Sequence, residues 1–250
     1  MLIDSHCHLV NEDYDIDEVI ERAKKAGIQY LIVSGSEKED NKLNMELLGK
    51  YNNVFLSVGY HPSMASSVTE EDYNFLEKCL MNDKVVAIGE IGLDYHYGKE
   101  DIEEQKSLFR RQMDIAKKNN LPAVIHSRDA TADTIEILSE YPEVKCDIHC
   151  FSGSLETARI YISMGYKLGI GGVVTFKNSN LYKVIEAIGC ENILLETDAP
   201  YLTPVPFRGK KNSSKYIKFI AKRISEILDI SEEEVSKITL SNTYSLFDLK

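Results

Sequence analysis

Eight short runs of apolar and β-branched residues recur along the chain, and longer stretches with helical periodicity separate them. This alternation is typical of βα units arranged around a parallel sheet. The runs cover residues 2–8, 30–35, 54–59, 85–93, 123–126, 145–151, 167–171 and 193–197. Eight such runs in a chain of 250 residues predict a (β/α)8 TIM barrel, with one domain over residues 1–250.

Signals for helix ends agree with this interpretation. The segment 15–26 precedes a glycine, and Thr69 with Asp72 resembles a capping arrangement. Ser231 with Glu234 repeats that arrangement near the C-terminus, and the segment 101–119 offers a stripe of apolar side chains that predicts an outer helix.

The run at residues 167–171 is the least distinctive of the eight. It contains Gly169 and Gly171, and Gly172 follows, which is also typical of a loop. If this run is not a strand, the chain folds as a doubly wound open sheet, and this is the structural alternative.

Composition excludes several classes of protein. No stretch approaches the roughly 18 to 20 uninterrupted apolar residues of a membrane span, and the N-terminus lacks the basic start of a signal peptide, so we expect a cytoplasmic protein without a membrane segment. The five cysteines are odd in number and scattered through apolar runs, which argues against structural disulfides. A net charge of −11 argues against the broad basic surface of a duplex-DNA binder. No obligate protein partner is evident.

Polar residues at the ends of the predicted strands are the candidates for a functional site, because the active site of a TIM barrel lies at the carboxyl ends of its strands. His6 and His8 close the first strand, two residues apart, so both imidazoles point to the same side and can reach one cation. Four further candidates lie in or after strands four, five, six and eight: Glu90, His126, His149 and Asp198.

Each candidate also has an ordinary structural explanation. Glu90 could be a buried acid paired with a lysine, His126 a packed core histidine, and Asp198 the cap of a loop. Taken together, however, these explanations require a separate coincidence at five strand ends, whereas one shared site accounts for all of them. Imidazole and carboxylate are ligands that Zn, Mn, Fe and Co accept, and carboxylates also suit Mg. Four histidines and two acids are enough for two ions.

Six ordered motifs resemble the TatD-type metal-dependent deoxyribonucleases, a family within the wider amidohydrolase-like barrels. The motifs are Asp4-Ser5-His6-Cys7-His8-Leu9, Gly59-Tyr60-His61-Pro62, Gly89-Glu90-Ile91-Gly92-Leu93-Asp94-Tyr95, Ile125-His126-Ser127-Arg128, His149-Cys150-Phe151-Ser152-Gly153-Ser154 and Glu196-Thr197-Asp198-Ala199-Pro200-Tyr201. Together they span nearly the whole chain.

The resemblance implies a two-metal phosphodiesterase. It implies His6 and His8 on one ion, His126 and His149 on the other, Glu90 as a bridge between them, and Asp198 beside the attacking water. Glu90 and Asp198 would be the catalytic carboxylates, and the two divalent cations would be Mg, Mn or Zn. The resemblance also implies trimming of single-stranded DNA, or of another phosphodiester, from 3′ to 5′.

Three further residues receive supporting roles. Arg128, two residues beyond His126, is the predicted contact for a substrate phosphate, although a surface ion pair would also explain it. His61 and Glu196 are expected to support the ligands through hydrogen bonds. One departure is visible: the family usually continues Arg-Gly-Lys-Arg-Asn-Glu-Pro after strand eight, whereas this chain ends the same stretch with Ser213-Ser214, and a serine cap is expected to start the last barrel helix in place of proline.

Two other functions remain open at this stage. An amidohydrolase-type enzyme acting on a small amide or ester, including an aminoacyl ester, would use the same ions and Asp198. A non-catalytic binding barrel is the other, and six ligands without a metal would have no evident purpose in it.

Overall fold

A computed structural model describes residues 1–9, 15–96, 98 and 100–249. Strands alternate with helices along the chain, and every pair of neighbouring strands is parallel where its register is given. The strands are β1 (Leu2–Cys7), β2 (Ile28–Ser34), β3 (Val54–Val58), β4 (Val85–Asp94), β5 (Ala123–Arg128), β6 (Cys146–Ile148), β7 (Lys167–Ile170) and β8 (Ile193–Leu195).

The helices follow these strands in the order expected for βα units. They are α1 (Ile16–Lys25), α2 (Lys38–Lys50), α3 (Glu70–Cys79), α4 (Ile102–Asn119), α5 (Thr131–Ser139), α6 (Leu155–Ser163), α7 (Leu181–Ile188), α8 (Ile217–Leu228) and α9 (Glu232–Phe247). Three 3₁₀ turns accompany them: η1 (Pro62–Met64), η2 (Gly172–Thr175) and η3 (Ser214–Tyr216).

Strand neighbours follow chain order from β1 to β8, which confirms the predicted (β/α)8 TIM barrel and excludes the doubly wound sheet. The glycine-rich run is a strand, because Leu168, Gly169 and Ile170 pair in register with β8. On the other side of β8, an isolated bridge joins Ala199 to Cys7 of β1. The first and last strands are therefore neighbours.

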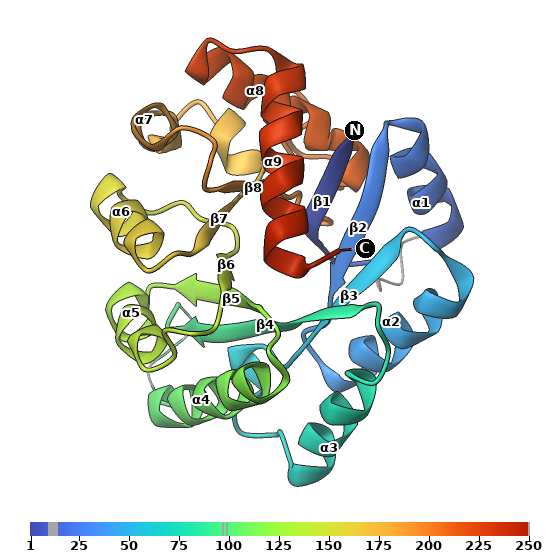
Figure 1. Cartoon of the computed structure of the whole chain (residues 1–250), viewed down its shortest axis with the longest axis vertical. Helices are drawn as coiled ribbons and strands as arrows, with labels where there is room; N and C mark the ends of the chain where they lie inside the picture. The colour runs from blue at the N-terminus through green and yellow to red at the C-terminus, as the bar shows by residue number, and fades with distance from the viewer. Residues whose placement is uncertain (10–14, 97, 99, 250) are drawn as a thin grey trace. The chain divides into compact units, whose positions relative to one another are not determined.

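Contacts divide the chain into two compact units. Unit 1 is Met1–Val33 with His149–Lys250, and unit 2 is Ser34–Ile148. Within unit 1, α8 and α9 pack against each other and against β1 and β8, and Figure 1 shows α9 beside β1. Within unit 2, α4 packs against β4. One domain over residues 1–250 stays a prediction.

The predicted helix starts agree with the observed caps. Thr69 and Asp72 form a reciprocal capping box at α3, and the Ser231 side chain accepts from the Glu234 N–H at α9. The expected serine cap before the last barrel helices is wrong, because Ser213 makes no side-chain cap bond at η3.

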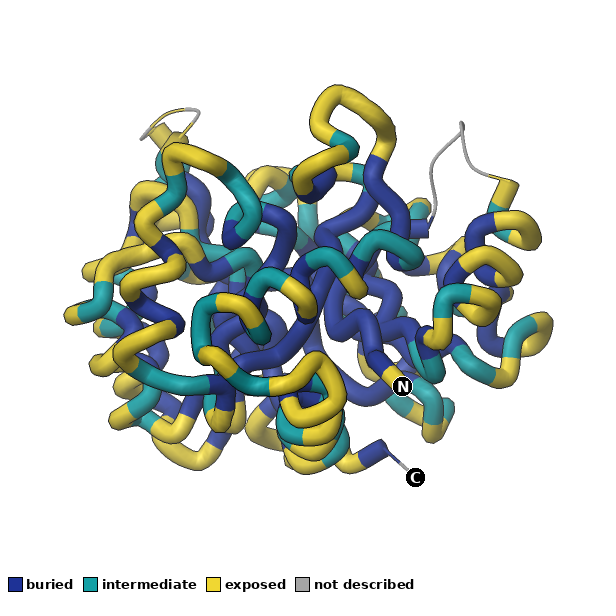
Figure 2. Tube along the Cα trace, turned by 90° about the horizontal axis from the view of Figure 1, so that it is seen from above, coloured by how far each residue is buried: buried dark blue, intermediate teal, exposed yellow. Residues whose placement is uncertain are grey.

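The strands are mostly buried, and Figure 2 colours buried residues dark blue. β1 and β4 are buried along their whole length, although both carry charged or polar side chains. The structure joins no two of the five cysteines in a disulfide, and four of the five are buried. Among the described residues, no helix combines the length and apolar character needed to cross a membrane.

Candidate metal centre

The predicted site residues lie within strands or in the loops that follow them. His6 is in β1, Glu90 in β4 and His126 in β5, as expected from the sequence. The predicted sixth strand, over residues 145–151, is too long. It ends at Ile148, so His149 is the first residue of the following loop.

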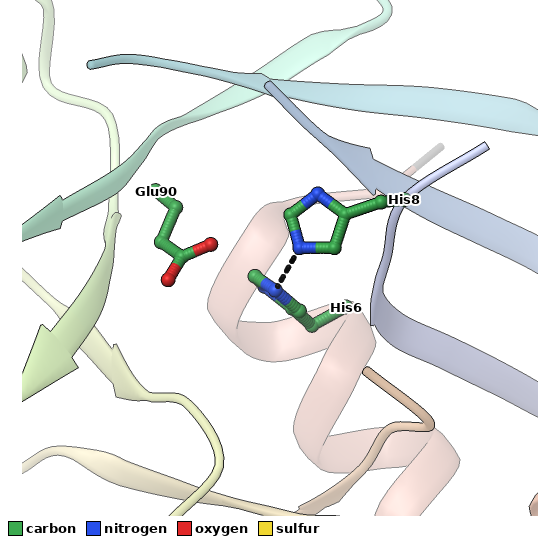
Figure 3. Close-up of side chains that lie close together, drawn as sticks. All are labelled: His6, His8 and Glu90. Atoms are coloured by element: carbon green, nitrogen blue, oxygen red, sulfur yellow. Dashed lines mark hydrogen bonds between the residues drawn. The ribbon is translucent and has the colours of Figure 1, made fainter. Parts of the chain in front are cut away.

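Unit 1 brings two imidazoles together at the end of β1. The His6 ring is fully buried and the His8 ring is partly exposed, and their Nε2 atoms lie 3.2 Å apart. Figure 3 marks this contact with a dashed line; it also draws Glu90, which comes from β4. The backbone explains the arrangement, because the His8 N–H donates to the Ala199 carbonyl and the Asp198 N–H donates to the His6 carbonyl. Strand β1 therefore holds the loop that carries Asp198.

Asp198 completes a set of three donors in unit 1. Its Oδ1 lies 3.6 Å from Nε2 of His6 and 3.7 Å from Nε2 of His8. Its φ of 52° is in the left-handed region, which aspartate tolerates better than most residues. With the 3.2 Å between the two imidazoles, these separations define a point about 2.0 Å from all three atoms. Zinc bonds to imidazole nitrogen and carboxylate oxygen are roughly 2.0–2.2 Å long, so the donor set fits such an ion.

His149 adds a fourth donor to this set. Its ring stacks on that of His6, with centroids 4.0 Å apart and planes at 23°. Donor atoms of His6, His149 and Asp198 lie within 4.8 Å of one another. The structure thus groups His149 with His6, whereas the resemblance assigns it to the ion of His126.

Glu196 contacts the loop that carries His149. Its carboxylate is fully buried and accepts from the backbone N–H of Cys150 at 2.7 Å, and it lies 4.0 Å from Nδ1 of His149. Gly169 leaves room for it, because a Cβ there would stand 2.2 Å from Oε2 of Glu196. The glycine that weakened the strand prediction is therefore required by the packing of this acid.

Asp4 also acts on the backbone of the site. Its carboxylate accepts from the N–H and the hydroxyl of Thr197, at 2.9 and 2.6 Å. Burial outweighs these hydrogen bonds and raises the pKa of Asp4 to about 6. Asp4 thus fixes the segment immediately before Asp198.

Unit 2 presents a second set of donors. Nδ1 of His126 lies 2.7 Å from Oε1 of Glu90, and Nε2 of His61 lies 4.0 Å from the same oxygen. These three residues form one cluster with donor atoms within 4.8 Å. Gly92 brings the two strands together, since its φ is 141° and a Cβ would stand 2.0 Å from the His126 carbonyl.

Asp94 belongs to this set, and sequence reasoning assigned it no role. Its Oδ2 lies 3.1 Å from Nε2 of His126, so His126 stands between two acids. Burial disfavours the charged ring, but hydrogen bonds to Asp94 and Glu90 raise the pKa of His126 to about 9. The two carboxylates therefore favour positive charge at this position. The signal was available, because Glu90, Gly92 and Asp94 alternate along β4 and so face the same side.

His61 and Arg128 are placed differently from the ligands. The Ser63 N–H donates to Nδ1 of His61 at 3.1 Å, and the Ser63 hydroxyl lies 2.8 Å from the same nitrogen. Its Nε2 atom is therefore the one that faces Glu90. Arg128 ends β5 with an exposed side chain, two residues after His126.

Comparison with known proteins agrees with this architecture. Residues 3–248 match the family model described as TatD related DNase. The chain is 44% identical over 252 residues to the uncharacterized metal-dependent hydrolase YabD of Bacillus subtilis, and the alignment covers 99% of each chain.

Two solved structures extend the comparison. The chain is similar to the TatD homologue YJJV of Escherichia coli, with a TM-score of 0.92 and 31% identity, over 100% of this chain and 98% of the other. It is also similar to a TatD family hydrolase of Entamoeba histolytica, with a TM-score of 0.86 and 27% identity over 98% and 97% of the two chains.

Proposed function

Since the chain belongs to the family of TatD-related DNases, we propose that it hydrolyses the phosphodiester bonds of single-stranded DNA from the 3′ end. The observation that carries this proposal is the donor chemistry. Histidine and carboxylate side chains gather at the carboxyl ends of parallel strands, in sets whose spacing suits divalent cations. Such sets serve hydrolysis of esters that water alone attacks very slowly.

The proposed centre holds two ions, Mg, Mn or Zn. His6 and His8 would hold one ion and His126 and His149 the other, and Glu90 would be shared between them. The family resemblance supplies this assignment, and the donor geometry within each unit supports the choice of ligands. Asp94 and Glu196 orient His126 and the His149 loop, which is the usual task of acids behind metal-binding imidazoles.

The residues divide the work of hydrolysis among them. Bound divalent cations supply Lewis acidity, which makes water a stronger nucleophile near neutral pH and offsets negative charge on the phosphodiester. Asp198 accepts the proton of the attacking water. Arg128 holds a phosphate oxygen. His61 lies beside Glu90 and supports the ligands from behind.

A cluster of aromatic and lysine side chains in unit 1 supports a single strand as substrate. The ring of Phe207 stacks on that of Tyr216, with centroids 4.5 Å apart, and Phe219 packs edge-on against Phe207. Lys210, Lys215 and Lys218 lie over these three rings. Positive charge interleaved with aromatic faces is how proteins bind single strands without sequence preference. The net charge of −11 leaves few other places for a polyanion.

Labelled strands test the proposal. We expect stepwise shortening of a linear single strand from its 3′ end, little cleavage of the matching duplex, and none of the circular single strand. The dependence of affinity on salt should be shallow, because each phosphate contact contributes about −0.7 to the slope of log affinity against log salt and roughly two to four contacts are expected.

The outcomes separate the alternatives. Equal cleavage of circle and linear strand would remove the dependence on an end. Hydrolysis of small amides or esters, with no strand degraded under Mg, Mn or Zn, would establish the amidohydrolase-type activity instead.

Replacing Arg128 by alanine tests its contact with phosphate. We expect kcat/KM for the linear strand to fall about 10- to 100-fold, mainly through KM, because a hydrogen bond to a charged oxygen is lost. Arg110→Ala is the matched control, since Arg110 forms a bidentate surface pair with Glu140. If both variants retain normal kinetics, Arg128 is a surface ion-pair residue.

A further inference from the structure

A cavity of about 590 Å³ opens in unit 1 between the loops that precede α6 and α7. Its walls come from three short segments: residues 152–155, residues 173–180 and the first turn of α7. The proposed hydrolytic chemistry uses none of these side chains. The volume lies within the roughly 300–1,000 Å³ of small-molecule sites.

The loops that line the cavity also lead to the donor set of unit 1. Ser152 follows His149 by three residues, in the loop between β6 and α6. The segment with Val173 and Phe176 follows β7, and the hydroxyl of Thr175 accepts from the backbone N–H of Val205, in the loop beyond Asp198. The cavity therefore lies among the βα loops that carry active sites in TIM barrels.

The lining combines an apolar wall with polar groups at its margin. Leu181 and Val184 are buried, Val173 and Phe176 are half-buried, and Asn178 carries an exposed amide. One aromatic ring, that of Phe176, belongs to this wall. The cavity thus offers apolar contact to a flat ring and hydrogen bonds to its edge.

Two cations flank this wall. The guanidinium of Arg208 lies 4.0 Å from the centroid of Phe176 and is tied to the Thr203 carbonyl. Lys183, on α7, lines the cavity with an exposed side chain. A ligand that is both flat and anionic matches this combination better than a purely apolar one.

From these features we infer that the cavity holds the base of one nucleotide of the substrate strand, with Arg208 and Lys183 beside its phosphates. This inference rests on the proposed function, because it names how the strand is held near the ions. The base packs against Phe176 and the aliphatic wall, and Asn178 bonds to its edge. Contact of this kind tolerates any base, since each has an apolar face.

A scan with abasic strands tests the inference through binding rather than turnover. The probes are short fluorescent thymidine strands in which one nucleotide at a time lacks its base, and anisotropy gives their affinity for the Asp198→Asn protein with metal present. We expect one position where removing the base weakens binding about 5- to 100-fold, the range for loss of one stacked base. The other positions should change little.

Variants of Phe176 connect that position to the cavity. In a Phe176→Ala background, strands with and without the critical base should bind almost equally, and Phe176→Trp should restore the difference. Tyr182→Ala is the matched control, because Tyr182 is an exposed aromatic six residues away on α7 that does not line the cavity. Melting temperatures establish that each variant is folded.

The possible failures are distinct. If wild-type protein degrades DNA but the abasic scan is flat, or if Phe176→Ala leaves the positional penalty intact, the cavity is not a base site and the proposed activity stands. If no single strand is bound or degraded at all, both the activity and the base site are wrong.

Discussion

An Asp198→Asn protein is expected to lose about 10²- to 10⁴-fold in kcat while it keeps its fold and much of its metal. The amide retains the size of the carboxylate and one oxygen near His6 and His8, but it cannot accept a proton from water. Asparagine also tolerates the left-handed backbone at φ 52°, so the loop beyond β8 should not move. The loss should therefore appear in turnover rather than in stability.

The matched control is the same aspartate-to-asparagine change at another residue whose backbone is left-handed. Asp229 ends α8 in the left-handed conformation, with φ 53°, and Asp229→Asn should keep full activity. The measurements are kcat on the linear strand, metal content and melting temperature for both variants. Near-normal turnover of Asp198→Asn would remove Asp198 from the proton transfer.

Much of the fold could be predicted because each strand of a barrel is a short apolar run with recognisable ends. The bounds differ most where a strand gives way to the site. The predicted sixth and eighth strands extend to residues 151 and 197, whereas β6 ends at Ile148 and β8 at Leu195. The predicted second strand starts at residue 30, whereas β2 begins at Ile28. Cys150 has a φ of 49°, which takes the chain out of the sheet after His149. The apolar pattern of the sequence thus continues for a few residues after the backbone has left the sheet.

The candidate ligands could be predicted for a similar reason. His6 and His8 are two apart on one predicted strand, and the other four lie in or just after further predicted strands. Their positions relative to these strands were enough to identify them as candidate ligands. Asp94 was given no role although it stands in the motif that contains Glu90, and its spacing from Glu90 places it on the same face of β4. The cavity between α6 and α7 could not be predicted, because its walls are three loop and helix segments with no common pattern.

Single replacements of His6 and His149 by alanine are expected to remove different ions. Loss of a direct ligand should lower the affinity of the protein for that ion by at least about 10- to 100-fold. That is the range for loss of a group that only supports a ligand from behind. If the proposed assignment is right, each variant keeps one of the two ions that the wild-type protein binds. Activity should be lost in both, because the hydrolysis requires the pair.

The stacking of the two rings makes this pair of variants decisive. His6 and His149 lie with centroids 4.0 Å apart, in one group with Asp198, so a shared ion is the direct alternative to the family assignment. Elemental analysis after reconstitution with zinc or manganese, followed by titration of each variant with the same metal, separates the two. His96→Ala is the control, since His96 is exposed and pairs with Asp129. The binuclear centre is supported if the wild type and the control bind two ions and each variant loses affinity for a different one. If both variants lose the same ion, His149 belongs with His6. If the wild type binds less than one ion, the two-ion proposal is wrong.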